Sequence, residues 1–318
     1  MRRYDHLKDH RRDFLAATGL TRAELALLLP AFEAAYDDLY PPHLPATGPA
    51  RQRQGEGGAH GVLVDWEDQL WFIVVDQKTY PLQTMQGLHL GLSQPPTTSW
   101  MQRVLPVVQR ALQPLGRLPA RDGSHVATPP LAPAGGVLEL AMDGTERRRQ
   151  RPHDATRPRD HSRGKQKTHT DKTILVVNET TAKGIYLGPP VTGKTPDKTA
   201  ADEAAITYPG KATLAKDSGF QGDEPAGVQT RQPQTKPKHK EVRVAERVLH
   251  GFLSGVRVVV EHGIAGVTRC RMVQDVLRLT KQGISDLVME IACGLHNLRM
   301  ACRHPLPAFN MQDLLNSA

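Results

Sequence analysis

Apolar residues recur every three or four positions over much of the first 112 residues, which is the spacing of amphipathic helices. Thr21 and Glu24 form a capping box directly before an apolar run, so a helix is predicted to begin there. Pro30 is predicted to end that helix or to start the next one. A further helical pattern runs from Asp65 to Pro81. The N-terminal region is therefore predicted to be all-α.

A short helix near 82–90, a turn with a glycine and a longer helix over 94–112 follow. This order is typical of a helix-turn-helix, although a small helical bundle also has short helices separated by turns. In a helix-turn-helix the second helix enters the major groove of DNA, and residues of its N-terminal half touch base edges. The candidate contacts here are Thr97, Thr98 and Arg103.

The pattern changes after residues 113–136, which are rich in proline, glycine and alanine and are predicted to be a linker. Short apolar runs then predict strands at 137–144, 172–180, 184–188 and 211–219, and helical patterns predict helices at 195–206, 242–270 and 283–300. Strands and helices in one segment indicate a mixed α/β fold. We therefore predict a helical domain at 1–112, an α/β domain at 137–304 and a tail at 305–318.

The formal net charge is +8, which favours an anionic partner, most commonly a nucleic acid. Most of this excess lies between Glu146 and Lys172, where ten Lys or Arg residues face four Asp or Glu residues. The segment directly follows a predicted strand with an acidic residue at its end, so its charges are predicted to contact DNA phosphates. The candidates are Arg147, Arg148, Arg149, Arg163, Lys165 and Lys167.

The chain has three cysteines, an odd number, and no C-x-x-C pair that would indicate a zinc site. No apolar signal core follows the charged N-terminus, and no run of about 18 apolar residues occurs. These features together predict a cytoplasmic protein.

Residues 188–195 read GPPVTGKT and satisfy the P-loop pattern between a predicted strand and a predicted helix. Two of the loop positions are proline, which has no N–H for a phosphate, and Val191 resists a positive φ. No apolar run ending in Asp-Glu follows to hold magnesium. An ATPase is therefore the least favoured of the alternatives.

Three acidic residues stand out by their placement. Asp143 and Asp217 each follow an apolar strand, at the end where open α/β sheets build their sites. Glu261 follows three valines in an apolar helix, where an unpaired carboxylate is costly and a bound divalent cation would remove the cost. Carboxylate oxygens are ligands that magnesium prefers. These acids are the candidate ligands of Mg²⁺ or Mn²⁺.

The segments around these acids resemble blocks of one family. They read AMDGTERRRQRP around Asp143, HSRGKQKTHTDKT at 161–173, LAKDSGFQG around Asp217 and VRVVVEHGIAGVTRCR around Glu261. With CGLHNLRM at 293–300 and the helical N-terminal region, they resemble the insertion-sequence transposases of the IS-five type, which are relatives of the Harbinger transposases.

The resemblance implies a ribonuclease-H-like fold in which Asp143, Asp217 and Glu261 form a DDE triad that holds two divalent ions. It implies a DNA transposase that cuts and joins double-stranded DNA as a homodimer or higher oligomer, associated with the nucleoid. Arg257, one helical turn before Glu261, is expected to neutralise charge in the transition state. Ser254 and Thr268 stand where related transposases carry Tyr and Lys. An inactive transposase that only binds DNA is the alternative.

Overall fold

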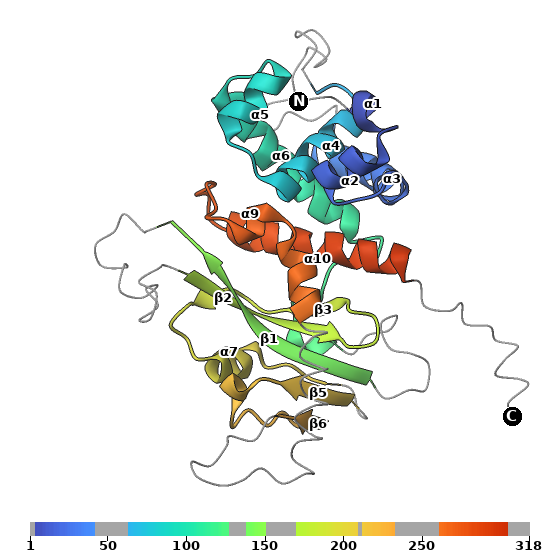
Figure 1. Ribbon diagram of the computed structural model, residues 1–318. Helices are drawn as coiled ribbons and strands as arrows, with labels where there is room; N and C mark the ends of the chain where they lie inside the picture. Colours follow the sequence, from blue (N-terminus) through green and yellow to red (C-terminus); the bar gives the residue numbers. More distant parts are fainter. Residues whose placement is uncertain are drawn as a thin grey trace, which may run out of the picture.

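The computed structural model describes residues 4–41, 63–126, 138–150, 170–208, 212–232 and 261–304. The N-terminal part is helical, as predicted (Figure 1). Its helices are α1 (Tyr4–Leu7), α2 (Arg11–Thr18), α3 (Arg22–Leu39), α4 (Trp66–Thr79), α5 (Gln83–Leu90) and α6 (Gln94–Leu112). Gly91 begins the turn between α5 and α6 with φ 68°, in the left-handed region that glycine adopts without strain.

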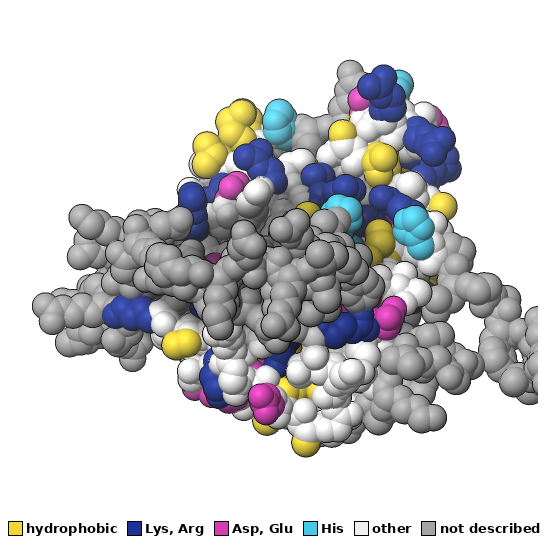
Figure 2. All heavy atoms as spheres, turned by 60° about the horizontal axis from the view of Figure 1, so that its bottom comes forward, with side chains coloured by type: hydrophobic (Ala, Val, Ile, Leu, Met, Phe, Trp, Pro, Cys, Tyr) yellow, Lys and Arg dark blue, Asp and Glu magenta, His cyan; other side chains and the backbone are white. Residues whose placement is uncertain are grey.

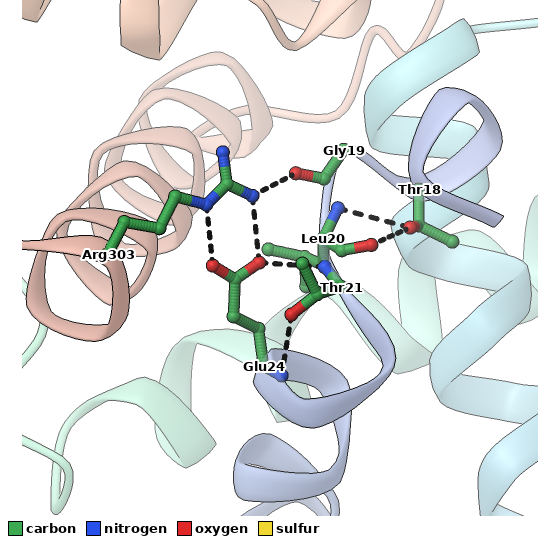
Figure 3. A network of polar contacts seen from close by, with 6 residues as sticks. All are labelled: Thr18, Gly19, Leu20, Thr21, Glu24 and Arg303. Carbon is green, nitrogen blue, oxygen red and sulfur yellow. Dashed lines mark hydrogen bonds and ion pairs between the residues drawn. The ribbon is translucent and has the colours of Figure 1, made fainter. Parts of the chain in front are cut away.

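The predicted capping box at the start of α3 is confirmed and is part of a larger network (Figure 3). The Thr21 hydroxyl accepts from the Glu24 N–H at 3.2 Å, and the Glu24 carboxylate accepts from the Thr21 N–H at 2.7 Å. Arg303 donates to the two oxygens of the same carboxylate at 2.7 and 2.9 Å. Glu24 is only 2% exposed. An ion pair between the buried Glu24 carboxylate and the partly exposed Arg303 guanidinium therefore ties the start of α3 to the C-terminal end of the described chain.

Pro30 lies inside α3, so the prediction that it ends or starts a helix is wrong. Proline removes one N–H from the helix ladder. However, Leu25, Leu28 and Phe32 on either side of it are fully buried, and most helical stability in proteins comes from such packing. The packing of the apolar face therefore outweighs the lost hydrogen bond.

The C-terminal part contains a mixed six-stranded sheet with the order β3-β2-β1-β5-β6, in which β4 also pairs with β2. Strands β1 and β2 are antiparallel, as are β2 and β3, whereas β1, β5 and β6 are parallel. The strands are β1 (Leu138–Arg148), β2 (Thr170–Asn178), β3 (Gly184–Leu187), β4 (Val191–Thr192), β5 (Ala212–Lys216) and β6 (Val228–Arg231). Four of these were predicted in place, whereas β4 and β6 were not.

Helices cover both faces of the sheet. On one face, α7 (Asp197–Ala204) packs its alanines against apolar side chains of β1, β2 and β5. On the other face, Leu175, Val177 and Leu187 join the core of the N-terminal helices. Helices α9 (Arg271–Gln274) and α10 (Ile284–Arg303) lie between the sheet and those helices (Figure 1). One apolar core thus continues from the N-terminal helices through α10 to the sheet.

The segment after α6 lies against the sheet. Ala120 pairs with Tyr186 of β3, and its N–H donates to the Ile185 carbonyl at 2.8 Å. A short 3₁₀ helix, η2 (Gly123–His125), follows. The first half of the predicted linker is therefore packed structure, and the second half lies outside the described residues.

Within the described residues, no single helix is both long and apolar enough to cross a membrane. Helices α2 and α3 meet that criterion only when they are taken together, across a 53° bend.

Asp76 of α4 is expected to make stability depend on pH. Its side chain is fully buried, and neither carboxylate oxygen has a hydrogen-bond partner among the described residues. Burial raises the pKa of Asp76 to about 8, an effect that the nearby charge of Arg278 only partly offsets. The native state thus holds a proton that the unfolded chain, with a pKa of about 3.9, releases. Stability should therefore fall as pH rises from about 4 to about 8.

Asp76→Asn removes this titration, because the amide is neutral at every pH. Between pH 5 and pH 8 the variant should gain roughly 3 kcal/mol of stability relative to the wild type. Denaturant unfolding of both proteins at several pH values measures this difference. Parallel pH profiles for the two proteins would rule out a protonated Asp76.

Candidate active site

The register of the sheet brings Asp143 and Asp217 together. The parallel pairing of β1 with β5 ends at Met142 and Lys216, and the two acids are the next residues on each chain segment. Neighbouring strands lie about 4.8 Å apart, so the two acids are adjacent. Alternate residues of a strand share a face, and the backbone of Asp217 is still extended at φ −77° and ψ 167°. Both side chains therefore lie on one face of the sheet.

The strand ends differ from the prediction. Strand β5 ends directly before Asp217, as predicted, but Asp143 lies in the middle of β1. Strand β1 continues to Arg148 because it stays paired with β2, from Asp143 opposite Leu175 to Arg148 opposite Thr170. Asp143 thus lies at the position where the pairing of β1 with β5 ends, and the polar second half of β1 continues past it.

The helix that contains Glu261 lies on the same face. Residues 261–268 are helical, and Ile264 packs against Ala141 and Ala215, which precede the two aspartates by two positions each. Gly263 comes close to β2, since an added Cβ would lie 3.0 Å from Val177. The helix can approach the sheet closely because Gly263 on the helix and Ala141 and Ala215 on the sheet are small. Glu261 is one helical turn before Ile264 and therefore lies on the same side of the helix.

The aspartates are held by the backbone beside them. Oδ1 of Asp143 accepts from the Gly144 N–H at 2.7 Å, and Oδ1 of Asp217 accepts from the Ser218 N–H at 2.6 Å. Asp217 thereby caps the 3₁₀ helix η3 (Ser218–Phe220). Glu261 is exposed. In the described part of the chain, no three His, Cys, Asp or Glu side chains are close enough to form a metal site.

Another carboxylate, that of Asp197, lies behind the two aspartates, on the face that α7 covers. A Cβ on Gly144 would lie 2.9 Å from Oδ1 of Asp197, and one on Gly219 would lie 2.6 Å from its Oδ2. Lys172 holds this carboxylate with an ion pair of 2.8 Å and donates to the Thr195 carbonyl at 2.8 Å. Asp197 therefore touches the backbone next to both candidate catalytic acids. The sequence signal for this contact is a glycine within two residues of each acid.

Gly219→Ala should lower DNA cleavage about a hundredfold, because the added methyl group must displace Asp197 or the turn that carries Asp217, and shifts of about 1 Å can cost that much. Gly188→Ala is the matched control, since its Cβ would meet only ordinary contacts at 3.4 Å or more. Cleavage rates and unfolding midpoints of both variants decide the matter. Equal cleavage by the two variants would show that the close contact has no role in the site.

The predicted phosphate contacts separate into different environments. Arg147 is only 5% exposed and donates to the Ser285 carbonyl at the start of α10, and burial lowers its pKa. Its prediction as a phosphate contact is therefore corrected, because the side chain joins the sheet to α10. Arg148 and Arg149 are exposed, and Arg149 pairs with Asp171 at 3.2 Å. Arg163, Lys165, Lys167 and Arg257 lie outside the described residues.

The predicted base contacts on α6 also differ among themselves. Thr97 is fully buried, and its hydroxyl donates to the Ser93 carbonyl at 2.9 Å, so it cannot reach a base and that prediction is wrong. Thr98 is partly exposed and donates to the Gln83 side chain of α5 at 3.0 Å. Arg103 is exposed, and its guanidinium lies against the rings of Tyr36, Tyr40 and Trp100 at 5.1, 4.5 and 5.8 Å.

The segment that resembles a P-loop has another geometry. Val191 and Thr192 form β4 and pair with Lys172 and Asp171 of β2. A phosphate-binding loop needs consecutive free N–H groups that curve around the anion. The backbone is used here for pairing with β2, which argues against nucleotide binding at this place.

No curated protein and no solved structure matches this chain. Residues 142–297, which include all three candidate acids, match the family model described as DDE superfamily endonuclease. This match suggests transposase-like nuclease activity and implies a DNA substrate. The matched segment is 156 of the 318 residues, so this similarity covers just under half of the chain.

Proposed function

We propose that this chain is a DNA transposase that cuts and joins DNA with Asp143, Asp217 and Glu261. The observation that carries the proposal is the parallel register of β1 and β5, which makes the two aspartates neighbours inside the matched region. The helix of Glu261 packs on the same face through Ile264. Three carboxylates on one sheet face are the donor set that a divalent cation prefers.

The order of the strands supports a ribonuclease-H-like fold for the catalytic part. Three antiparallel strands, β3, β2 and β1, are followed by two parallel ones, β5 and β6, and helices cover both faces. In this arrangement Asp143 lies on the central strand, and Asp217 directly follows its parallel neighbour β5. The sheet thus fixes the separation of the two carboxylates before any substrate arrives.

Asp143, Asp217 and Glu261 would hold one or two Mg²⁺ or Mn²⁺ ions. Such ions, when bound, stabilise negative charge on phosphoryl oxygens. Water attacks one phosphodiester and leaves a 3′-hydroxyl, and this hydroxyl then attacks a target phosphodiester and displaces its 3′-oxygen. Arg148, exposed at the end of β1, would hold DNA near the cut through its phosphates. We propose the same role for Arg163, Lys165 and Lys167, and charge neutralisation for Arg257.

DNA recognition would lie on α5 and α6, where Thr98 and Arg103 remain candidate contacts and Thr97 does not. If the pair is a helix-turn-helix, α6 enters the major groove. Cleavage of both ends of an element requires two active sites held together, so we propose a homodimer or higher oligomer on double-stranded DNA. We further propose that it works in the cytoplasm, on the nucleoid.

A nicking assay tests the proposal. The wild-type protein is incubated with a supercoiled plasmid that carries the DNA flanking its gene, with Mg²⁺, with Mn²⁺ or with a chelator. We expect nicked or linear DNA with free 3′-hydroxyl ends only when a metal is present. Binding without any cleavage would instead identify an inactive, DNA-binding relative.

A further inference from the structure

A basic pocket lies where the N-terminal helices meet the catalytic part. It has a volume of about 480 Å³. Helix α2 contributes one wall, α4 contributes its last turn, and the third wall follows the helix at 261–268. The lining residues are Arg12, Leu15, Ala16, Gly19, Lys78 and Arg269. The pocket is distinct from α5, α6 and the basic segment of β1.

The pocket is cationic. Arg12, Lys78 and Arg269 line it, and no acidic residue does so among the described residues. Arg12 makes no hydrogen bond or ion pair with the described part of the chain. Lys78 donates to the Arg269 carbonyl at 3.2 Å, which holds its ammonium group beside that arginine. The three positive charges in the pocket repel each other, and an anion bound between them would offset this repulsion.

The surroundings of Lys78 add to this repulsion. Burial is the largest effect and lowers the pKa of Lys78, Cys270 raises it, and the guanidinium groups of Arg269, Arg299 and Arg271 each lower it by less. Gly19 ends α2 with φ 72°, and a Cβ there would lie 3.3 Å from Cδ of Lys78. Because Gly19 has no side chain, Lys78 has room to extend into the pocket.

The position of the pocket relative to the acids suits a DNA strand. Arg269 comes eight residues after Glu261, which corresponds to roughly 12 Å along a helix. Phosphates of one strand advance about 3.4 Å each along the DNA axis. Lys and Arg side chains also gather on the upper right of Figure 2, where the N-terminal helices lie. A strand cleaved at the acids would therefore bring another of its phosphates to the pocket.

We infer that Arg12, Lys78 and Arg269 form a binding site for one backbone phosphate of the DNA, a few nucleotides from the phosphodiester that is cut. The inference rests on the proposed function. The site holds the DNA without reading its sequence, because a phosphate carries no base information. It also links two parts of the protein through the substrate, since α2 and the helix of Glu261 both reach the same strand.

Salt dependence of DNA binding tests the site. Each phosphate contact contributes about 0.9 to the slope of log K against log salt. Arg12→Gln/Arg269→Gln should therefore flatten the slope by roughly one unit. The control Arg22→Gln/Lys198→Gln removes the same charge from exposed residues paired with Asp9 and Asp202, and it should leave the slope unchanged. Arg12→Lys/Arg269→Lys keeps both charges and should stay near the wild-type slope.

Methylphosphonate scanning locates the contact. Single phosphates near the cut are replaced by neutral methylphosphonates, and binding is measured with the wild type and the Arg12→Gln/Arg269→Gln variant. We expect one position that weakens wild-type binding about tenfold and has no further effect on the variant, as in a double-mutant cycle. In a separate arm, inorganic phosphate is titrated while thermal unfolding is followed.

The outcomes separate the two proposals. A wild-type protein that neither binds nor cleaves DNA overturns both. If the wild type binds and cleaves but the pocket variant keeps its slope and its methylphosphonate profile, the pocket inference alone is wrong. An equal loss of slope in the control pair overturns it too, since general charge would then explain the effect. Stabilisation by inorganic phosphate without any change in DNA binding would identify a free-anion site and overturn the DNA contact.

Discussion

Asp143→Asn, Asp217→Asn and Glu261→Gln are each expected to lower metal-dependent DNA cleavage about a thousandfold or more, with little change in DNA binding. Each substitution removes one negative charge from the three carboxylates that would hold the cation. A metal ion contributes several kcal/mol of transition-state stabilisation, and about 4 kcal/mol corresponds to a thousandfold in rate. Cleavage is measured on the same supercoiled plasmid as for the wild type.

The substitutions keep the size of each side chain, so the fold should survive. An asparagine at 217 can still accept from the Ser218 N–H, and Glu261 is exposed. Asp202→Asn is the matched control, because Asp202 is an exposed acid of α7 that pairs with Lys198 at 2.6 Å. The control should cleave like the wild type. Near-normal cleavage by any of the three test variants would exclude that residue from the active site.

Arg303→Ala is expected to destabilise the protein by about 3 kcal/mol. The change leaves the Glu24 carboxylate, which is only 2% exposed, without the guanidinium that donates to both of its oxygens. Breaking a fully buried ion pair from one side typically costs about 3–5 kcal/mol, and the partial exposure of Arg303 places the expected cost at the lower end of this range. For a chain of this size the melting temperature should fall by about 4 °C. Thermal or denaturant unfolding measures the loss.

Two comparisons make this test specific. Arg22→Ala breaks an ion pair with Asp9 in which both partners are exposed, so it should cost less than about 1 kcal/mol. Arg303→Met/Glu24→Gln removes both charges and should recover part of the stability, because no buried charge is left alone. If Arg303→Ala is no more harmful than Arg22→Ala, the ion pair contributes little to stability.

Regular local patterns made most elements predictable. The capping box of α3, the turn at Gly91 and the apolar runs of β2 and β3 each carry a signal within a few residues. Even the burial of Thr97 has such a signal, because it lies on the helical stripe with Met101, Val104 and Val108, all of which are buried. The prediction of Thr97 as a base contact used its place in the helix and overlooked that stripe.

Features that depend on distant partners could not be predicted in this way. Strand β1 extends to Arg148 through polar residues because β2 pairs with it along its whole second half. Strand β6 has only four residues with little apolar content and exists through its pairing with β5. The sequence blocks predicted Asp143, Asp217 and Glu261 as site residues, but only the register shows that the two aspartates are neighbours.

Folding during synthesis depends on contacts between the two ends of the chain. Glu24 pairs with Arg303, and α10 shares its apolar core with α3 and α6. Helices α1–α6 end at residue 112, whereas α10, which covers their apolar faces, ends at residue 303. At about 5–20 residues per second, the ribosome needs roughly 10–40 s to make that stretch. The leucine-rich faces of the N-terminal helices stay uncovered for this time. A nascent chain should therefore acquire stable N-terminal helices only after residues up to 303 have been translated.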